Sequence, residues 1–419
     1  TVSLTGSTIR TDDVGGHGVH TQNNANAGGY GGSYAAYLGT VTVNLDSNSL
    51  ILAYGAGSYG VFFGSTYGNG VAGADCDTSY NATCNTLNNQ GTVYSAASTA
   101  VVGSDNGDRV NNYGTLSGST ASLNMMGGDD VVWLGTGTDI TGIMLGGDQD
   151  TLPGDIDIRA LDDSALGDAL FLSGMGSLGA DSDEFEVLRM VGDVWELQAG
   201  TNQNLTVGAT VESGTLFVNG TLTAPDTIVH HGATLGGIGT VMGFLENSGT
   251  VAPGNSIGTL TNDGDFLQNS DGTLEIEFTS AIAPGQEGVE SDLLIVTGSA
   301  EINGTVKFIN LSGVDVAVDT GGTPIVIVDS GVNPIVFNGT VTGAQFAQVI
   351  PGQEDDFGFV SFASTPNGVA QAFIPTTFEA SDLFIQALGS ETNGNRRGGN
   401  SQSAALTASQ TALDRNSFV

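Results

Sequence analysis

Apolar and polar positions alternate over short stretches that glycine separates. In Leu274–Phe278 apolar residues alternate with glutamates, the period of two expected for a strand with one exposed face. Elsewhere the apolar runs are shorter and follow a Gly-Thr pair, as in Gly249-Thr250-Val251 and Gly258-Thr259-Leu260. Glycine takes positive φ at a corner without steric cost, and Thr, Val and Leu suit a pleated strand. The pattern predicts many short strands joined by tight turns.

The strand-and-turn unit recurs with a period of about 20 residues, a size typical of solenoid repeats. Asn89-Gln90-Gly91-Thr92-Val93 is echoed one repeat later by Asn112-Tyr113-Gly114-Thr115-Leu116, and Asn247-Ser248-Gly249-Thr250-Val251 has the same form. A repeat of this size matches one coil of a right-handed parallel β-helix, in which each coil stacks on the next. We expect the recurring asparagines to form a stacked amide ladder at a corner.

One stretch carries a family resemblance. Gly214–Phe266 contains GTLFVNGTL, then GGIGTV, then NSGTVAPGNSIGTL followed by GDF. This order of segments resembles the passenger-associated transport repeat of bacterial autotransporters, the type V secretion family, and VAPGNSIG at Val251–Gly258 is its most specific part. The resemblance implies a β-helical passenger exported through the periplasm to the bacterial outer membrane, hence an extracellular or cell-surface location. It implies no single activity, because passengers include adhesins, proteases and esterases.

The predicted fold class is all-β: a right-handed parallel β-helix with a C-terminal β-sandwich-like cap. Four regions are expected: a Gly- and Tyr-rich N-terminal β region at 1–85, the β-helix at 86–265 with the transport repeat at 214–265, a cap at 266–388 and a linker at 389–419. The cap resembles the autochaperone segment of autotransporters, and it would cover the exposed strand edges at the end of a solenoid. The chain starts at Thr1 without a signal peptide, and we expect a released or isolated passenger.

Composition agrees with a turn-rich β protein. The 65 glycines are about twice the average share, while 39% hydrophobic residues argue against disorder and the irregular glycine spacing argues against collagen. No apolar run approaches the ~18 residues of a membrane helix, so the chain as given is not expected to be transmembrane.

Charge narrows the function classes. The 45 acidic residues outnumber the 8 basic residues and give a net charge of −37, with Lys307 the only lysine. Nucleic-acid binding uses lysine and arginine to displace counterions from phosphates, so this composition excludes a nucleic-acid partner. An anionic membrane surface repels such a chain as well. The charge favours solubility and attraction for cations.

The acidic residues are therefore candidate ligands for a cation. Gly107-Asp108-Arg109-Val110, Gly128-Asp129-Asp130-Val131 and Gly147-Asp148-Gln149-Asp150 form a second series whose steps are close to the coil period. It resembles the calcium-binding nonapeptide of RTX proteins, although the third glycine and the nine-residue period are missing. The calcium candidates are Asp129, Asp130, Asp148 and Asp150. The alternative is that these aspartates are solvated corner residues and that no cofactor is required.

Two N-terminal features leave alternatives open. Asp12, Asp13, His17 and His20 lie close enough in sequence for a cation site, or are polar turn residues. The tyrosine-rich runs GGYGGSYAAYLG and YGAGSYGVFFGSTYG either form a contact surface or fill the interior of the coil.

The two cysteines indicate an oxidising compartment. Cys76 and Cys84 are eight residues apart in a turn-rich segment, which favours a local disulfide over a metal site that needs more ligands. Closing so short a loop stabilises the fold by roughly 2–3 kcal/mol in the chain-entropy model.

No catalytic motif stands out. The sequence has neither a GxSxG nucleophile elbow nor an HExxH zinc motif, and we expect no enzymatic activity. The alternative is a β-helix enzyme acting on polysaccharide, with Arg109, Arg159 or Arg189 beside an acidic pair, or a calcium-stabilised RTX-like surface protein. The predicted function is a structural or adhesive role at the cell surface. Its partners would be further copies of the chain in a homo-oligomer or surface assembly, or the surface or glycans of a host or neighbouring cell.

Overall fold

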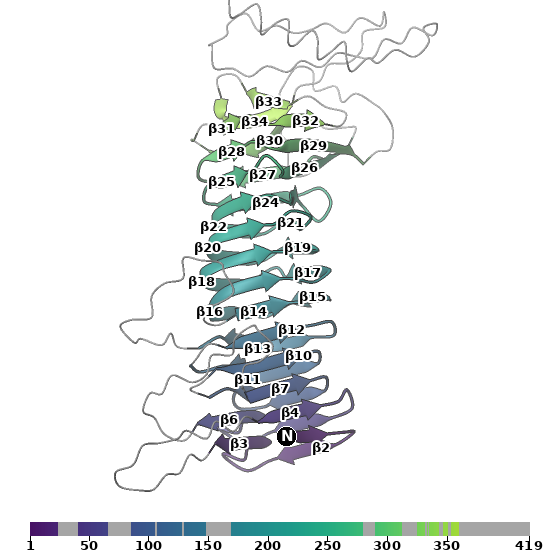
Figure 1. Ribbon diagram of the computed structural model, residues 1–419, viewed down its shortest axis with the longest axis vertical. Coiled ribbons are helices and arrows are strands. Elements are labelled where there is room, and N and C mark those ends of the chain that lie inside the picture. The colour runs from purple at the N-terminus through teal and green to yellow at the C-terminus, as the bar shows by residue number, and fades with distance from the viewer. Residues whose placement is uncertain are drawn as a thin grey trace, which may run out of the picture. The chain divides into compact units, whose positions relative to one another are not determined.

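The computed structural model describes residues 1–23, 41–65, 85–104, 107–127, 130–147, 169–279, 290–311, 325–331, 333, 335–342, 347–350 and 353–359. In these ranges the regular structure is all strand, with no helix (Figure 1). The chain divides into two compact units, Thr1–Thr227 and Ile228–Val419.

Unit 1 is a parallel β-helix in which each coil contributes a strand to three columns. The first column holds β1 (Val2–Leu4), β4 (Thr42–Leu45), β7 (Asn85–Asn89), β10 (Asp108–Asn112), β12 (Val131–Leu134), β14 (Ala169–Leu172) and the ends of β16 (Ser182–Met190) and β18 (Asn202–Val211). The second holds β2 (Thr8–Thr11), β5 (Leu50–Ala53), β8 (Thr92–Ser95) and the starts of β11 (Thr115–Asn124) and β13 (Asp139–Leu145). In the later coils β15 (Met175–Leu178), β17 (Val194–Leu197) and β19 (Thr215–Val218) pair with one another in a separate sheet. The third holds β3 (Val19–Asn23), β6 (Val61–Ser65), β9 (Val101–Val102), the ends of β11 and β13 and the starts of β16 and β18.

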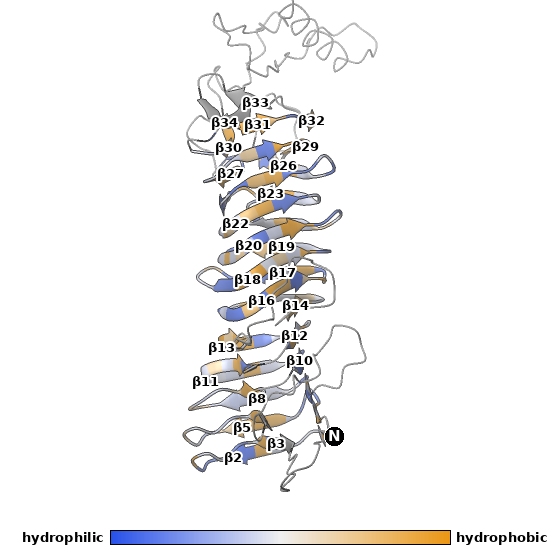
Figure 2. Cartoon of the chain, turned by 60° about the vertical axis from the view of Figure 1, so that its left-hand side comes forward, coloured by the Kyte–Doolittle hydropathy of each residue, from blue (hydrophilic) through white to orange (hydrophobic). Residues whose placement is uncertain are grey.

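Alternate residues of these strands fill the interior of the coil. In the first column Val43, Leu87, Val110 and Val132 follow one another in register, and each is fully buried. Figure 2 shows apolar and polar residues alternating within many strands. Because successive side chains of a strand point to opposite faces, a period-two sequence sends one apolar set inward in every coil.

The β-helix begins at β1, so the separate N-terminal region expected at 1–85 is not a different architecture. The coil spacing explains why the sequence pattern did not reveal this. The step from Val43 to Leu87 is about twice as long as the steps from Leu87 to Val110 and from Val110 to Val132. Residues 66–84, outside the described ranges, lie within the long step, and the regular period of the sequence is lost there.

Unit 2 is also a parallel β-helix with three columns, and β20 (Thr221–Val229) contains the boundary between the units. Its columns are, first, the start of β22 (Thr240–Asn247), β24 (Thr259–Asp263), β27 (Leu293–Val296) and β30 (Ile325–Asp329); second, the end of β22, β25 (Phe266–Gln268), β28 (Ala300–Ile302) and β31 (Ile335–Phe337); and third, β21 (Thr234–Gly237), β23 (Thr250–Pro253), β26 (Thr273–Phe278), β29 (Thr305–Asn310) and β32 (Thr340–Thr342).

The boundary expected at residue 266 is likewise not a change of architecture. Parallel pairing continues through β25, β28 and β31, with Phe266 opposite Ala300. Antiparallel pairing occurs later, where β34 (Gln353–Phe359) lies beside β30 and β33 (Ala347–Ile350). The coil lengthens here, because the step from Phe266 to its partner Ala300 is longer than the step from Leu245 to Phe266. Longer strands with wider spacing therefore look like a separate domain in the sequence.

The predicted asparagine ladder is confirmed for the first pair. Asn89 Nδ2 donates to Asn112 Oδ1 over 2.7 Å, and both side chains are fully buried. Each Oδ1 also accepts the backbone N–H two residues on, at Gly91 and Gly114, which closes the corner. Asn247 makes the same turn with Gly249 over 3.0 Å. A second, partly exposed ladder joins Asn44, Asn88 and Asn111 with 2.8 Å steps, and the sequence analysis missed it.

The first two members of the second predicted series lie on neighbouring strands, β10 and β12, but in a register shifted by one residue, and Asp148, Gln149 and Asp150 of the third member lie outside the described residues. The sequence analysis placed Val110 opposite Val131, whereas Val110 pairs with Val132 and Arg109 with Val131. The shift by one residue follows from period two, because only this register stacks the buried Val132 on the buried Val110. It also brings Asp130 next to Asp108, whose backbone N–H donates to Asp130 Oδ1.

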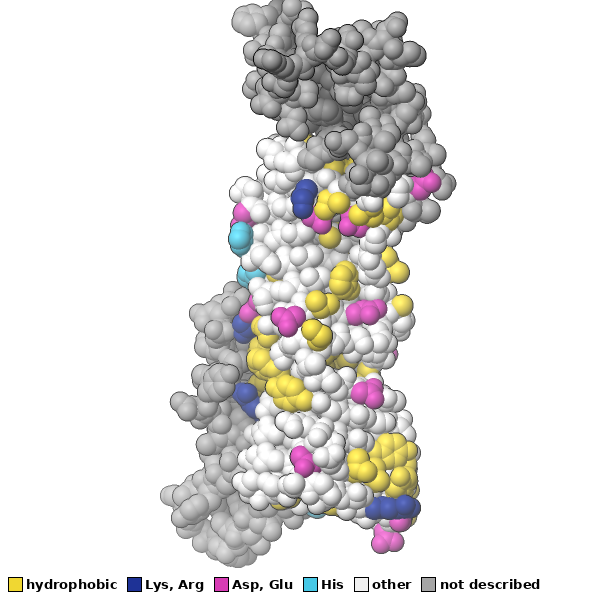
Figure 3. Space-filling model, turned by 90° about the vertical axis from the view of Figure 1, so that its right-hand side faces the viewer, with side chains coloured by type: hydrophobic (Ala, Val, Ile, Leu, Met, Phe, Trp, Pro, Cys, Tyr) yellow, Lys and Arg dark blue, Asp and Glu magenta, His cyan; other side chains and the backbone are white. Residues whose placement is uncertain are grey.

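Many acidic side chains accept a hydrogen bond from an amide or hydroxyl group of the next coil. Asn204 Nδ2 donates to Asp183 over 2.7 Å and Asn219 Nδ2 donates to Glu196 over 2.8 Å. In unit 2, Asn269 donates to Glu246 over 2.7 Å, and Thr297 donates to Asp263 over 2.6 Å. On the face drawn in Figure 3 the acidic side chains lie scattered among uncharged ones. These carboxylate–amide rungs satisfy the acids without neutralising their charge.

Candidate functional site

Four aromatic side chains gather on the outside of the first two coils of unit 1. His17-Gly18-Val19-His20 lies in register with Tyr59-Gly60-Val61-Phe62 of the next coil, with Val19 opposite Val61 and His20 opposite Phe62. Both valines are buried in the interior. His17, Tyr59 and Phe62 are half-buried and His20 is exposed. We call these four side chains the ring quartet.

The four rings form one cluster, in which rings of neighbouring coils stack on each other and the rings of one coil are inclined to each other. His17 stacks on Tyr59 with a centroid distance of 4.9 Å, and His20 stacks on Phe62 at 4.8 Å. Within one coil the centroids of His17 and His20 are 5.3 Å apart, as are those of Tyr59 and Phe62. Offset and edge contacts of this kind stabilise aromatic pairs by about 0.5–1.5 kcal/mol beyond area burial.

Glycine at the second position lets the two coils approach. A Cβ at Gly18 would lie 2.7 Å from the Gly60 carbonyl oxygen, and one at Gly60 would lie 2.4 Å from Val93 Cγ1. Without these Cβ atoms the two coils come close enough for the Gly18 N–H to donate to the Tyr59 carbonyl over 2.9 Å. The aromatic-Gly-Val-aromatic sequence therefore fixes a backbone contact that brings the flanking rings into register.

His17 is held in its neutral form. Its Nδ1 accepts the backbone N–H of Tyr59 over 3.1 Å, so Nδ1 carries no proton and Nε2 is the donor. Burial, and then the neighbouring His20 imidazole, lower the pKa of His17. At neutral pH the quartet therefore contains one uncharged imidazole N–H group, at Nε2 of His17.

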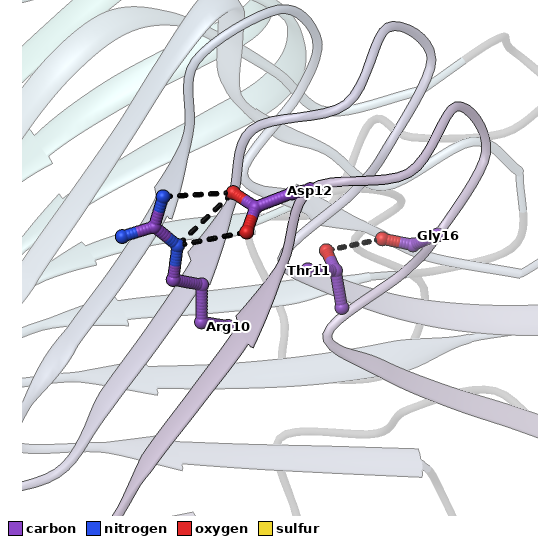
Figure 4. A network of polar contacts seen from close by, with 4 residues as sticks. All are labelled: Arg10, Thr11, Asp12 and Gly16. Carbon is purple, nitrogen blue, oxygen red and sulfur yellow. Dashed lines mark hydrogen bonds and ion pairs between the residues drawn. The ribbon is translucent and has the colours of Figure 1, made fainter.

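A second aromatic group lies on the second column of the first three coils. The Arg10 guanidinium carbon lies 4.7 Å from the centre of the Tyr54 ring, and the Tyr54 and Tyr94 rings are 5.6 Å apart. Tyr54 is 40% exposed. Asp12 forms an ion pair with Arg10 at 2.9 Å, and beside it the Thr11 hydroxyl donates to the Gly16 carbonyl (Figure 4). Tyr54 and Tyr59 thus lie outside the coil, whereas Phe63 of the same run is buried inside it.

The four residues proposed as an N-terminal cation site separate into different contacts. Asp12 pairs with Arg10, Asp13 uses its carbonyl to accept the Ser58 hydroxyl over 2.9 Å, and His17 and His20 belong to the ring quartet. Among the described residues no group of three or more histidine, cysteine or acidic side chains is arranged to hold a metal ion.

Of the four calcium candidates only Asp130 lies in the described ranges; Asp129, Asp148 and Asp150 lie outside them. Asp130 is fully buried, so it is not the solvated corner residue that the alternative required. The neighbouring Asp108 carboxylate accepts Asn85 Nδ2 over 2.7 Å. Cys76 and Cys84, proposed to form a disulfide, also lie outside the described residues.

Two of the three arginines considered for catalysis are described. Arg109 is on β10 and Arg189 on β16, and β12 and β14 lie between them in the first column. Arg189 donates to Glu212 Oε1, and its guanidinium lies 5.4 Å from the Phe171 ring centre. Arg159 lies outside the described residues. The structure does not bring Arg109 and Arg189 into one cluster.

The structure also places three further residues with ring side chains, of which one is buried and two are exposed. Trp195 is fully buried and donates its Nε1–H to the Ser173 carbonyl over 3.1 Å. His230 and His231 are exposed at the turn after β20, where the His230 carbonyl accepts the Ala233 N–H.

Comparison of the chain with models of protein families and with curated proteins gives no match. A search of the described part of the chain for a helix with the length and apolar character of a membrane span gives none.

Proposed function

We propose that the chain is a secreted, cell-surface autotransporter passenger with a structural and adhesive role. The parallel β-helix is the fold that the transport-repeat resemblance implies, and it presents a regular outer surface around an interior filled by Val, Leu and Ile. The chemistry of that outer surface is therefore available to a partner.

The observation that carries the proposal is the outward placement of aromatic side chains on the first coils. The ring quartet and the Arg10–Tyr54–Tyr94 group expose rings that a solenoid interior would otherwise bury. Tyrosine, histidine and arginine at an exposed surface supply large contact area with polar tips, the composition that recognition surfaces favour.

Coated beads provide the test. Beads carrying the protein should cluster with one another or attach to bacterial cells, and a Tyr54→Ala/Phe62→Ala double variant should do so more weakly. Tyr113→Ala is the matched control, because Tyr113 is 43% exposed and its ring lies against Gly135, away from both groups. Beads that stay dispersed and bind no cells at any protein density would contradict the proposal.

A further inference from the structure

We propose that the outer face of the second column in the first three coils joins two copies of the chain side by side. The face consists of outward side chains of β2, β5 and β8 and of the residues that directly follow these strands. The inference rests on the proposed structural and adhesive function and names one partner for it, a second copy of the chain, together with the surface that binds it.

Two parallel rows of side chains make up this face. Arg10 lies opposite Leu52 of the next coil, and Leu52 lies opposite Tyr94 of the third coil. The backbone hydrogen bonds between coils continue one residue past β5 and β8, at Tyr54 and Ala96. The outward positions therefore form one row of Arg10, Leu52 and Tyr94 and a second row of Asp12, Tyr54 and Ala96.

The side chains of both rows are accessible and already ordered. Tyr54 is 40% exposed, and Leu52 and Tyr94 are half-buried. Arg10 is held by the ion pair with Asp12 at 2.9 Å and by the Tyr54 ring, whose centre lies 4.7 Å from the guanidinium carbon (Figure 4). Burying the leucine and tyrosine surface favours association, and the fixed arginine loses little side-chain freedom when a partner binds.

Charge selects a second copy as the partner. The chain carries a net charge of −37, so copies repel each other in general. In the two rows, however, the charged residues are Arg10 and Asp12, one of each sign, and their side chains are 59% and 62% exposed. The face is therefore neutral as a whole and complementary in charge to itself.

A two-fold axis that runs along the stack of coils, between the two rows, brings each row against the other row of the second copy. Arg10 then faces the partner's Asp12, and Leu52 faces the partner's Tyr54. Each contact occurs twice, as an isologous interface requires. The four charges alternate in sign, because each arginine lies between its own aspartate and that of the partner. The two copies are parallel in this arrangement, so both can stand on one surface.

Sedimentation velocity at neutral pH in about 150 mM salt, where the Debye length is about 8 Å, measures the association. We expect the wild type to dimerise with a dissociation constant below about 100 μM. Arg10→Asp and Asp12→Arg each bring four like charges together across the axis. Each variant alone should therefore dimerise at least about tenfold more weakly than the wild type.

Mixing the two charge variants identifies the face. In a pair made of one Arg10→Asp chain and one Asp12→Arg chain, position 10 of each copy faces the opposite charge at position 12 of the other. An equimolar mixture should therefore recover the dimer that neither variant forms alone.

Neutral variants test the apolar part of the face. Tyr54→Ser should weaken dimerisation by about tenfold. Met175→Ser is the matched control and should leave it unchanged, because Met175 is 54% exposed on β15, outside the two rows. Thermal melting of every variant verifies that it is folded.

Failure of the inference is distinguishable from failure of the proposed function. A wild type that stays monomeric, a mixture that dimerises no better than its components, or a Tyr54→Ser variant that dimerises as well as the wild type overturns the interface, even when protein-coated beads still attach to cells. A dimer that the single variants lose and the mixture recovers establishes the interface even when beads neither cluster nor attach to cells, because a parallel pair can form on one bead.

Discussion

At the scale of single residues, buried amides decide whether the corners of the coil close. Asn112 Oδ1 accepts from Asn89 Nδ2 over 2.7 Å and from the Gly114 N–H, and its own Nδ2 donates to the Gly114 carbonyl over 2.9 Å. A fully buried donor without an acceptor costs about 1–3 kcal/mol. The Asn112 side chain therefore stabilises the fold by more than its own donated bond, because the Asn89 and Gly114 donors use its oxygen as an acceptor.

Replacing Asn112 with alanine should accordingly lower the free energy of unfolding by about 2 kcal/mol, since the Gly114 N–H loses its Asn112 acceptor and Asn89 Nδ2 keeps only the Thr115 carbonyl at 3.2 Å. Denaturant unfolding measures the loss. Asn111→Ala is the control, because Asn111 donates to Asn88 in the partly exposed ladder, and it should cost less than about 1 kcal/mol. Equal losses for the two variants would contradict the ladder's role.

Gly60 tests the close contact under the ring quartet. Gly60→Ala should destabilise the protein by about 2 kcal/mol or more, because the added Cβ would lie 2.4 Å from Val93 Cγ1 and 2.7 Å from the Ala100 carbonyl oxygen. Gly127→Ala is the matched control, with no atom within 4 Å of its Cβ and no positive φ. Chemical denaturation of both variants checks the difference, and a tolerated Gly60→Ala would show that the coils can separate at no cost.

We expect His17 to make the folded state less stable in acid. Its pKa is lowered in the folded state, so below about 6.5 the unfolded chain binds more protons at this position. Its contribution to stability is therefore present above about pH 6.5 and is lost as the pH falls below that value through the lower folded pKa. Between about pH 7.5 and pH 5.5 the wild type should lose more stability than His17→Gln, which does not titrate. Parallel pH dependences would show that protonation leaves the Tyr59 contact intact.

The residues that the sequence analysis identified and those it missed differ in their spacing. The Asn-X-Gly corners at Asn89 and Asn112 repeat after a single coil step, so a simple period predicted their ladder. His17–His20 and Tyr59–Phe62 also repeat as aromatic-Gly-Val-aromatic, but the step between them is about twice the coil period. Nothing local marks two such distant stretches as neighbours, so the sequence analysis did not pair them.

At the scale of the elements, the sequence predicts the strands and which of their side chains point into the coil, but it does not predict the coil lengths. Period-two alternation identified β26, and the Gly-Thr pairs identified β23 and β24. The register between β10 and β12 could be wrong by one residue, because aligning their Gly-Asp repeats and aligning their buried valines give two different pairings. Only burial selects the right pairing, since a shift by one residue reverses the face of every side chain.

Asp292, in the coil that joins β24, β26 and β27, should make the stability of the fold depend on pH. Its carboxyl accepts the Gly258 N–H over 2.9 Å and the Glu277 N–H over 2.7 Å, and it is 1% exposed. Burial raises its pKa to about 8, with the charges of Glu277 and Glu275 adding to the effect and the two N–H bonds opposing it. A carboxyl with a raised folded pKa stabilises the fold below its unfolded pKa, and this contribution is lost as the pH rises through about 8.

Between about pH 5 and pH 8 the group should lower the unfolding free energy by up to about 1.4 kcal/mol per pH unit. Asp292→Asn removes the titration, so its stability should vary less with pH, although it loses one of the two accepted bonds and is weaker at pH 5. Denaturant melts at several pH values measure the difference between wild type and variant. A difference that stays constant with pH would mean that Asp292 is already ionised at pH 5.

At the scale of the whole molecule, the acids are hydrogen-bonded but remain charged. The rungs from Asn204 to Asp183 and from Asn269 to Glu246 satisfy carboxylate oxygens with neutral amides. Within the described ranges, ion pairs join Arg10 to Asp12, Arg189 to Glu212 and Lys307 to Glu275. With 45 acidic and 8 basic residues, pairing cannot cancel the net charge of −37. Repulsion between the carboxylates therefore opposes folding.

That repulsion predicts a protein stabilised by salt. Raising sodium chloride from about 10 mM to about 1 M shortens the Debye length from about 30 Å to about 3 Å, which screens carboxylates in different coils from one another. The melting temperature at neutral pH should rise by several degrees. Near pH 4 many exposed carboxyl groups are protonated, so the same titration should give a smaller rise. A melting temperature that falls with salt at neutral pH, or an equal rise at both pH values, would mean that carboxylate repulsion does not limit the stability of this fold.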